Sequence, residues 1–139
     1  MVAYAPTEPS GDSDKDNFFN QLSAATQSVP PHDILTIHGD FNAVSGSRIS
    51  DCDSGVVGPY GSGIPNDNSN RLLTYCGMHD LTILGSWLRR LNIHRWTWMS
   101  HDGVTKKEID HVSSNPAGHT TMLKPRPTQT TSSLHQIFV

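Results

Sequence analysis

A helix that leads at once into a strand is the pattern that most limits the fold of this chain. Apolar side chains recur at helical spacing over residues 13–28, and Pro30-Pro31 ends that helix, because proline lacks an amide hydrogen and clashes with the preceding turn. Residues 34–37 are short, apolar and β-branched, which is typical of a buried strand. This pairing favours an α/β fold.

The rest of the chain continues the alternation of helix and strand. Residues 45–70 are rich in Gly, Ser, Asn and Asp and predict a long loop. Ser69 or Asn70 is the expected N-cap of a short helix that closes near Gly77. Three more strands are predicted over residues 81–84, 95–99 and 107–112, the last two paired across a turn at 100–103.

Length and composition predict one domain over residues 1–139. No apolar run approaches the roughly 18 residues of a membrane span, and the N-terminus lacks the basic and apolar parts of a signal peptide. We therefore expect no membrane partner and an intracellular, not secreted, protein, with the nucleus as a candidate compartment. Cys52 and Cys76 are expected to be free thiols. The net charge of −3 argues against broad, nonspecific coating of DNA.

The segment after the first strand carries the clearest chemical pattern. Asp40 and Asn42 stand two residues apart after Gly39, and in an extended segment such residues point to the same side while Phe41 points to the other. A carboxylate can orient or deprotonate an attacking water, and an amide can stabilise charge on a phosphate oxygen. The alternative is an Asx-turn that merely closes the strand.

Two further positions are candidates. Asp110 lies in an apolar strand and needs a partner. That partner is either a histidine that the carboxylate orients or a cation in a salt bridge, for which the nearby choices are Lys106, Lys107 and Arg95. The adjacent His111 cannot serve, because neighbours on a strand face opposite sides. Tyr4, in an extended N-terminal segment, could donate its hydroxyl to a phosphate or be an ordinary core or surface tyrosine.

The order of these motifs resembles the endonuclease/exonuclease/phosphatase superfamily, which includes exonuclease III-like and DNase I-like enzymes. The motifs are Tyr4-Ala5-Pro6-Thr7, Gly39-Asp40-Phe41-Asn42, Asn70-Arg71-Leu72-Leu73, Thr97-Trp98 and Ile109-Asp110-His111. The loop Gly55-Val56-Val57-Gly58-Pro59-Tyr60-Gly61 is similar to that of non-LTR retrotransposon endonucleases and of craniofacial development protein 2-like sequences. The resemblance is strong over residues 2–112 and weak over 113–139.

The resemblance implies a partial two-sheet α/β sandwich that hydrolyses a phosphodiester, in DNA, with Mg²⁺ or alternatively Mn²⁺. It implies that Tyr4 and Asn42 contact the phosphate, that Asp40 positions the water and contributes to the metal site, and that Asp110 orients a histidine. The candidate for that histidine is His135, in Ser133-Leu134-His135. Thr97 and Arg95 are expected to touch phosphate or DNA. Arg95 forms a basic patch with Arg89 and Arg90, for which a solvated surface is the alternative.

The sequence also departs from the family. The family's first half, which supplies an asparagine and the glutamate that holds Mg²⁺, has no counterpart here, and Leu134 replaces an aspartate of the metal site. We therefore expect the chain to be a fragment of a Mg²⁺-dependent endonuclease that is weakly active or inactive by itself. The alternatives are a catalytically inactive remnant of the fold and a phosphatase-type relative acting on a small phosphorylated substrate. The oligomeric state is left open.

Overall fold

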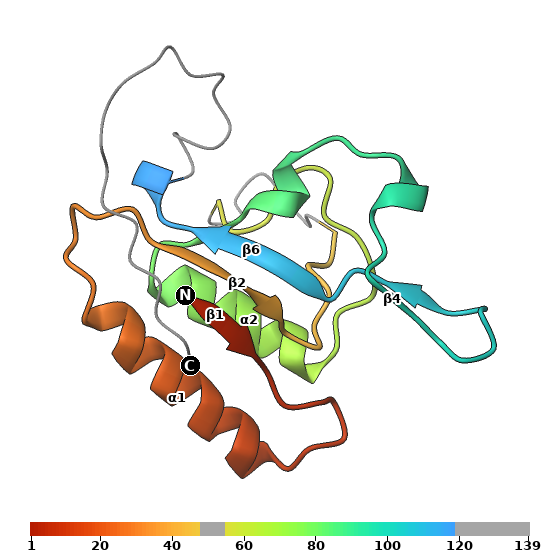
Figure 1. Ribbon diagram of the computed structural model, residues 1–139, viewed down its shortest axis with the longest axis horizontal. Coiled ribbons are helices and arrows are strands. Elements are labelled where there is room, and N and C mark those ends of the chain that lie inside the picture. Colours follow the sequence, from red (N-terminus) through yellow and green to blue (C-terminus); the bar gives the residue numbers. More distant parts are fainter. Residues whose placement is uncertain (48–54, 119–139) are drawn as a thin grey trace.

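A four-stranded mixed sheet forms the centre of the molecule (Figure 1). The computed structural model describes residues 1–47 and 55–118. In the sheet, the strands lie in the order β1, β2, β6, β3. Their bounds are Val2–Tyr4 for β1, Thr36–Asp40 for β2, Asp110–Ser114 for β6 and Thr82–Ile83 for β3. Strand β1 runs parallel to β2, whereas β6 is antiparallel to both β2 and β3. The predicted α/β class is confirmed.

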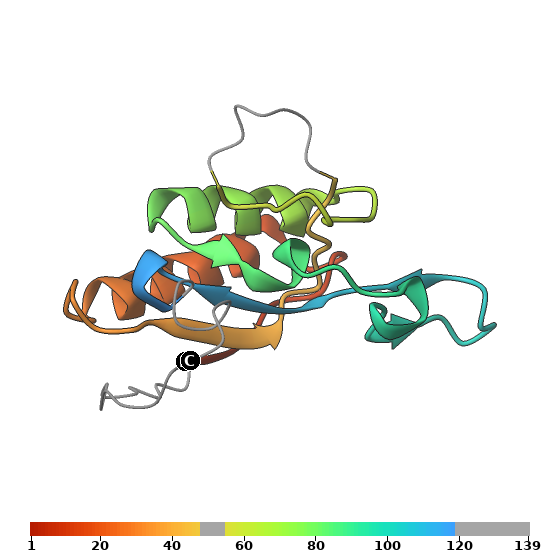
Figure 2. The same cartoon turned by 90° about the horizontal axis from the view of Figure 1, so that it is seen from above.

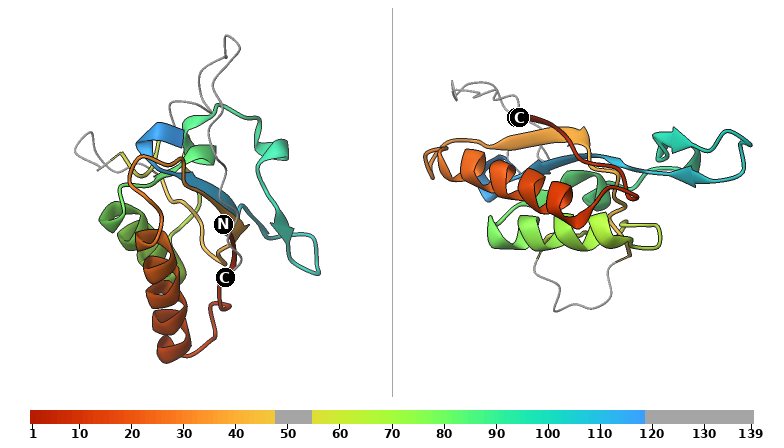
Figure 3. Two further views of the ribbon diagram at one scale, coloured as in Figure 1. Left: turned by 60° about the vertical axis from the view of Figure 1, so that its left-hand side comes forward. Right: turned by 90° about the horizontal axis from the view of Figure 1, so that it is seen from below.

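Two helices lie side by side over one face of this sheet (Figures 2 and 3). Helix α1, Asp12–Gln27, makes the crossover between the parallel strands β1 and β2, and helix α2, Asp67–Met78, precedes β3. The helix predicted over residues 13–28 is therefore confirmed to within one residue. The short 3-10 helices η1, Leu84–Trp87, and η2, Asn92–His94, connect β3 to the hairpin that follows.

The core lies between the helices and the sheet. Phe19 and Leu22 of α1 and Leu72 of α2 pack with Ile37 of β2 in one cluster of buried side chains. Full burial of such a side chain contributes about 1.5–3 kcal/mol. Lys15 joins the two helices through its ion pair with Asp67, at 3.1 Å, and the hydroxyls of Thr26 and Tyr75 lie 2.5 Å apart. Within the described residues, both helices therefore pack against the same face of the sheet.

A two-stranded hairpin projects from the sheet beside the N-terminal start of β6 (Figures 1 and 2). It consists of β4, Trp98–Met99, and β5, Lys106–Lys107. The predicted turn at 100–103 is confirmed, since Gly103 has a φ of 71° and its amide donates to the Ser100 carbonyl at 2.8 Å.

Several predicted boundaries were wrong. The segment 107–112 is not one strand, because its first residue pairs in the hairpin while Asp110 and its successors pair in the main sheet. Residues 81–84 form strand only at Thr82–Ile83 before the 3-10 helix begins. The strand predicted at 34–37 begins at Thr36 and extends through Asp40. Short apolar runs mark burial, whereas strand ends depend on which neighbour supplies hydrogen bonds.

The N-cap of α2 was also wrong. Asn66, not Ser69 or Asn70, precedes the helix, and its side chain accepts from the Ser69 amide at 2.8 Å. The Ser69 hydroxyl in turn accepts from the Asn66 amide at 3.1 Å, which makes a reciprocal capping box. The helix begins three residues earlier than predicted because two residues share the cap.

Candidate functional site

Three candidate residues stand in one row across neighbouring strands. Tyr4 is the register partner of Asp40, and Asp40 is the register partner of Asp110. Directly opposite residues on paired strands have Cβ atoms about 4.5–5.5 Å apart and share a face of the sheet. Asp110 and Tyr4 are exposed, the latter to 69%, and Asp40 is half-buried. The fold therefore brings together two carboxylates and a phenol that lie far apart in the sequence.

Asn42 completes this group just beyond the end of β2. Its backbone is left-handed, with a φ of 47°, so the extended geometry expected for Asp40 and Asn42 was wrong. Instead the Asn42 amide donates to Oδ1 of Asp40 at 2.8 Å, which is the Asx-turn considered as the alternative. Phe41, in the middle of this turn, is fully buried as predicted. We call Tyr4, Asp40, Asn42 and Asp110 the sheet-end site.

The Asn42 side chain is oriented by the loop after β1. Its Nδ2 donates to the Ala5 carbonyl at 2.9 Å, and the Ala5 amide donates to the Asp40 carbonyl at 2.8 Å. An Asn side chain has two N–H donors and an acceptor oxygen. One donor therefore holds the two loops together, and within residues 1–47 and 55–118 no partner is found for the second N–H.

Burial raises the pKa of Asp40 above its ordinary value. The hydrogen bond from the Asn42 amide works against this shift, and the facing Asp110 carboxylate adds to it, because two like charges disfavour ionisation. Carboxylates with raised pKa values in a shared site are typical of groups that handle protons or cations. The chemistry available at this point is proton acceptance, cation binding, or both.

Residues Asp110 and His111 face opposite ways, as expected. The His111 ring is buried, and its Nε2 lies 2.8 Å from the Ala43 carbonyl, to which it must donate. Burial lowers the pKa of His111, so the ring is neutral in the core. His135, the predicted catalytic histidine, lies outside the described residues, as does Cys52. Cys76 is a free, buried thiol whose pKa burial raises to about 12.

Thr97 and Arg95 lie beside the row, and each is engaged within the protein. The Thr97 hydroxyl accepts from the amides of Ile109 and Asp110, at 3.1 and 3.2 Å. It thus fixes the backbone that carries Asp110. Arg95 pairs with Glu108 at 3.3 Å, not with Asp110, and also donates to the Tyr60 carbonyl.

Two of the three arginines of the predicted basic patch form ion pairs with Glu108. Arg90 also pairs with the buried Glu108, at 2.5 Å, and both Arg89 and Arg90 are exposed. Glu108 therefore organises two of the three arginines. Sequence reasoning missed this glutamate because its two partners lie 13 and 18 residues away.

A further set of residues that sequence reasoning missed comes from the first turn of α2. Nδ2 of Asn66 donates to the Asn42 carbonyl at 3.0 Å, and Nδ2 of Asn68 donates to the Pro6 carbonyl at 2.9 Å. The carboxylate of Glu8 accepts from the amides of Asp67 and Asn68, at 3.0 and 3.3 Å. The run of polar residues 66–69 before a helical pattern was the available signal, but its partners depend on tertiary structure.

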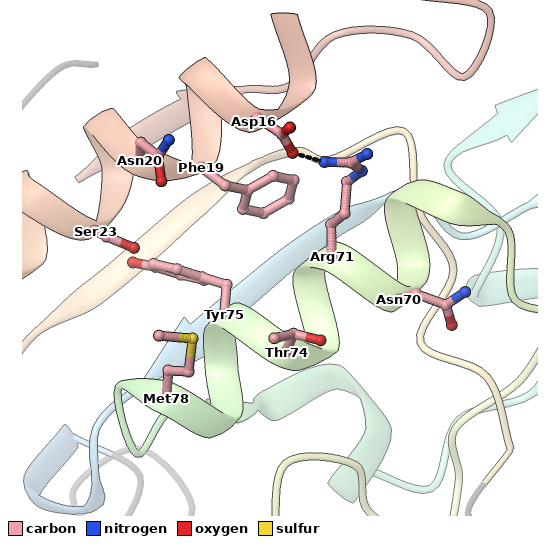
Figure 4. Close-up of a pocket in the computed structure, with 9 residues that line it drawn as sticks. All are labelled: Asp16, Phe19, Asn20, Ser23, Asn70, Arg71, Thr74, Tyr75 and Met78. Carbon is pink, nitrogen blue, oxygen red and sulfur yellow. Dashed lines mark hydrogen bonds and ion pairs between the residues drawn. The ribbon is translucent and has the colours of Figure 1, made fainter. Parts of the chain in front are cut away.

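Two cavities help to locate the site. One of about 300 Å³ is lined by Asp110, Thr97 and Glu108 and so borders the row of candidates. Another, of about 430 Å³, lies between α1 and α2 and is lined by none of the sheet-end residues (Figure 4). Arg71, at its rim, is held by three aspartates, Asp12, Asp16 and Asp67. Of the predicted site residues, Asp110 and Thr97 therefore line the first cavity, whereas Tyr4, Asp40 and Asn42 line neither.

Metal and membrane features are limited within the described part of the chain. In residues 1–47 and 55–118, no three His, Cys, Asp or Glu side chains come together as a set of metal ligands. In the same residues, no helix has the length and apolar content needed to span a membrane.

The geometry can be set beside known proteins. No family model matches the chain. It is similar to craniofacial development protein 2. The identity is 28% with the Bos taurus protein and 27% with that of Tragulus javanicus, in each case over 141 aligned positions that cover 100% of this chain. The chain spans 23% and 24% of those relatives' own lengths. The predicted resemblance to craniofacial development protein 2-like sequences is thereby confirmed, whereas membership of the wider nuclease superfamily stays a prediction.

Proposed function

We propose that this chain carries the phosphate-binding side of a Mg²⁺-dependent nuclease that acts on DNA. The observation that supports the proposal most is the row Tyr4, Asp40 and Asp110 across three neighbouring strands, with Asn42 at its end. The same four positions carry the resemblance to phosphodiester-hydrolysing enzymes.

Each residue of the sheet-end site has a role in this proposal. Asp40 lies at the end of β2, opposite Asp110, and orients the attacking water. The exposed Tyr4 hydroxyl and the second Nδ2 hydrogen of Asn42 donate to phosphate oxygens. Asp110 provides a second carboxylate whose backbone Thr97 holds in place. His135, which lies outside the described residues, is the proposed partner that this carboxylate would orient.

The side chains present fit a magnesium ion that is shared with a phosphate. Mg²⁺ in phosphoryl-transfer sites is commonly held by one or two carboxylates, the rest of its ligands being water and phosphate oxygens. Asp40 and Asp110, opposite each other on β2 and β6, would supply those carboxylates. When bound, the ion would act as a Lewis acid on the phosphate and stabilise the developing charge.

The hairpin beside the site favours a polymeric substrate over a small phosphorylated molecule. Trp96, Trp98 and Met99 are each 39–49% exposed, and the Lys106 ammonium stands 4.6 Å from the centroid of the Trp96 ring. Exposed aromatic rings interleaved with lysines are typical of surfaces that bind nucleic acid, since rings stack on bases and lysines neutralise phosphates. A DNA strand that crosses the sheet-end site would meet this hairpin.

A second candidate function is phosphodiester binding without hydrolysis. It is favoured by the scarcity of metal ligands, because the described residues contain no cluster of three. A site that lacks one of its carboxylates loses both charge and geometry for the metal. This candidate predicts affinity for DNA that depends on Tyr4 and Asn42 but no cleavage.

The experiment compares nicking of supercoiled plasmid by the full chain, with Mg²⁺ and with a chelator. Asp40→Asn is the test variant, because Asn retains the Oδ1 that accepts from the Asn42 amide while the charge is lost. Asp80→Asn is the matched control, since it makes the same charge change in a left-handed position that Asn tolerates, with a φ of 53°. Binding of a fluorescent duplex is measured in parallel for all three proteins and for Asn42→Ala.

The outcomes separate the two candidates. Nicking that requires Mg²⁺ and is lost in Asp40→Asn but kept in Asp80→Asn supports the nuclease. Duplex binding without nicking, weakened by Asn42→Ala, supports the binding function alone. Nicking that persists in Asp40→Asn removes Asp40 from the mechanism, and a folded chain that neither binds nor nicks refutes both.

A further inference from the structure

The first turn of α2 touches both loops that carry the sheet-end site. The loop after β1 receives the bond from Asn68 to the Pro6 carbonyl, and the loop after β2 receives the bond from Asn66 to the Asn42 carbonyl. The Ser69 hydroxyl also accepts from the Val44 amide at 3.0 Å. The start of α2 therefore contacts the backbone two residues after Tyr4, at Pro6, and two residues after Asp40, at Asn42.

The helix end is itself fully occupied by these interactions. Its amides at Asp67 and Asn68 are bonded to the Glu8 carboxylate, and its amide at Ser69 to the Asn66 side chain. Donors at a helix N-terminus that already have acceptors offer no anion site. The turn is thus not a binding site, and its outward-reaching side chains are what bear on the sheet-end residues.

Asn42 is the residue whose conformation most needs support. A left-handed backbone is uncommon for a residue other than glycine, although asparagine tolerates it better than most. Such a conformation persists where surrounding contacts determine it. Here the amide is held by Asp40, the side chain by Ala5 and the carbonyl by Asn66 at 3.0 Å. The Asn68 side chain also donates to this carbonyl, at the longer distance of 3.5 Å, so the Asn66 bond is the shorter of the two that come from the start of α2.

We propose that Asn66 is a positioning residue that aims Asn42 at the phosphate, through the hydrogen bond from its side chain to the Asn42 carbonyl. The inference rests on the proposed function for its consequence, namely phosphate binding by Asn42. Its structural part, the control of Asn42 by Asn66, stands apart from any activity. Asn66 combines this task with capping, because its Oδ1 caps α2 while its Nδ2 reaches Asn42.

The two tasks of Asn66 can be separated by substitution. Asn66→Ser keeps an oxygen that caps the helix, because serine is about as good an N-cap as asparagine, but it is too short to reach the Asn42 carbonyl. Asn70→Ser is the matched control, since Asn70 is exposed on the same helix and makes the same chemical change. Retention of the melting temperature and of amide protection within α2 shows that the cap is intact.

The first measurement is hydrogen exchange of the Asn42 amide together with the chemical shifts of its side-chain amide. We expect Asn66→Ser to speed exchange at Asn42 about three- to tenfold, because loss of the bond to its carbonyl weakens the turn in which its amide is held by Asp40, and to shift the side-chain resonances. Asn70→Ser should leave both unchanged. Unchanged exchange and shifts at Asn42 in Asn66→Ser would overturn the inference, whatever the chain does to DNA.

The second measurement is a double-mutant cycle on duplex affinity. If Asn66 acts through Asn42, Asn66→Ser weakens binding several-fold in the wild-type background and has no further effect in Asn42→Ala. The same loss in both backgrounds would overturn the inference, because Asn66 would then act by another route. A wild-type chain that does not bind the duplex refutes the proposed function, and the exchange measurement then decides the positioning role alone.

Discussion

Gly39 is the position at which one methyl group should disturb both the fold and the sheet-end site. It pairs with Ala3 in the parallel ladder of β1 and β2, and a Cβ built on it would lie 1.9 Å from the Ala3 carbonyl oxygen and 2.8 Å from its carbon. Side-chain carbons essentially never approach closer than 3.0 Å. The obstacle is backbone, so it cannot rotate away, and the strands would have to separate by about 1 Å.

The energetic cost follows from that separation. Overpacking of a buried contact costs about 1–3 kcal/mol. The hydrogen bonds that flank the pair, from His38 to the Met1 carbonyl and from Ala5 to the Asp40 carbonyl, would lengthen from 3.0 and 2.8 Å, and a weakened bond adds up to about 1 kcal/mol. We expect Gly39→Ala to lower the free energy of unfolding by about 2–4 kcal/mol and to move Tyr4 away from Asp40.

Urea unfolding followed by circular dichroism measures this change, from the shift in midpoint at constant slope. Gly77→Ala is the matched control, because Gly77 lies in α2 with its nearest obstacle, a Val56 methyl, at 4.0 Å. Alanine in a helix is more favourable than glycine by up to about 1 kcal/mol. The control should therefore stabilise the chain. A Gly39→Ala chain within about 0.5 kcal/mol of wild type, a margin typical of harmless surface changes, would refute the steric argument.

Three more predictions follow from charged and titrating groups. The pKa of His111 is lowered in the folded chain, so the unfolded chain binds the proton more readily, and stability should fall as the pH drops below the ordinary histidine pKa of about 6.5. In thermal melts, His111→Phe should remove most of this dependence of the melting temperature on pH. The remainder should come from His79, whose pKa is also lowered. The pKa of Asp40 is raised, in part by the Asp110 charge, so ionisation of Asp40 opposes folding above that pKa. Asp110→Asn should therefore raise the melting temperature at pH 7 while reducing activity. The gain in stability should stay below about 1 kcal/mol because the carboxylate is screened by solvent, and a lower melting temperature would contradict the prediction. Glu108→Gln should destabilise the chain by about 2–3 kcal/mol in urea unfolding, because two arginine partners lose a buried counter-charge; an unchanged midpoint would show that the ion pairs contribute nothing net.

Local sequence determined which segments of this chain become helix and which residues carry chemistry. The apolar spacing that predicted α1 works because a helix must bury one stripe of its surface, whatever it packs against. That Asp110 and His111 face opposite ways followed from the two-residue period of a strand. The choice of Asp40, Asn42, Asp110 and Tyr4 came from residue type and order.

Only the tertiary structure decided how those residues meet. The register that sets Tyr4 against Asp40 and Asp40 against Asp110 depends on strand pairing between segments far apart in the chain, which no local pattern encodes. The sequence left two alternatives at Asn42, an extended segment and an Asx-turn, and the structure has the turn, in which the Asn42 amide donates to Asp40 and the Asn42 carbonyl accepts from Asn66, the N-cap of α2. Likewise Arg95 forms its ion pair with Glu108 and not with Asp110, because ion pairs form between side chains that the fold brings within reach. The sequence therefore identified the residues of the sheet-end site, and long-range hydrogen bonding determined their geometry.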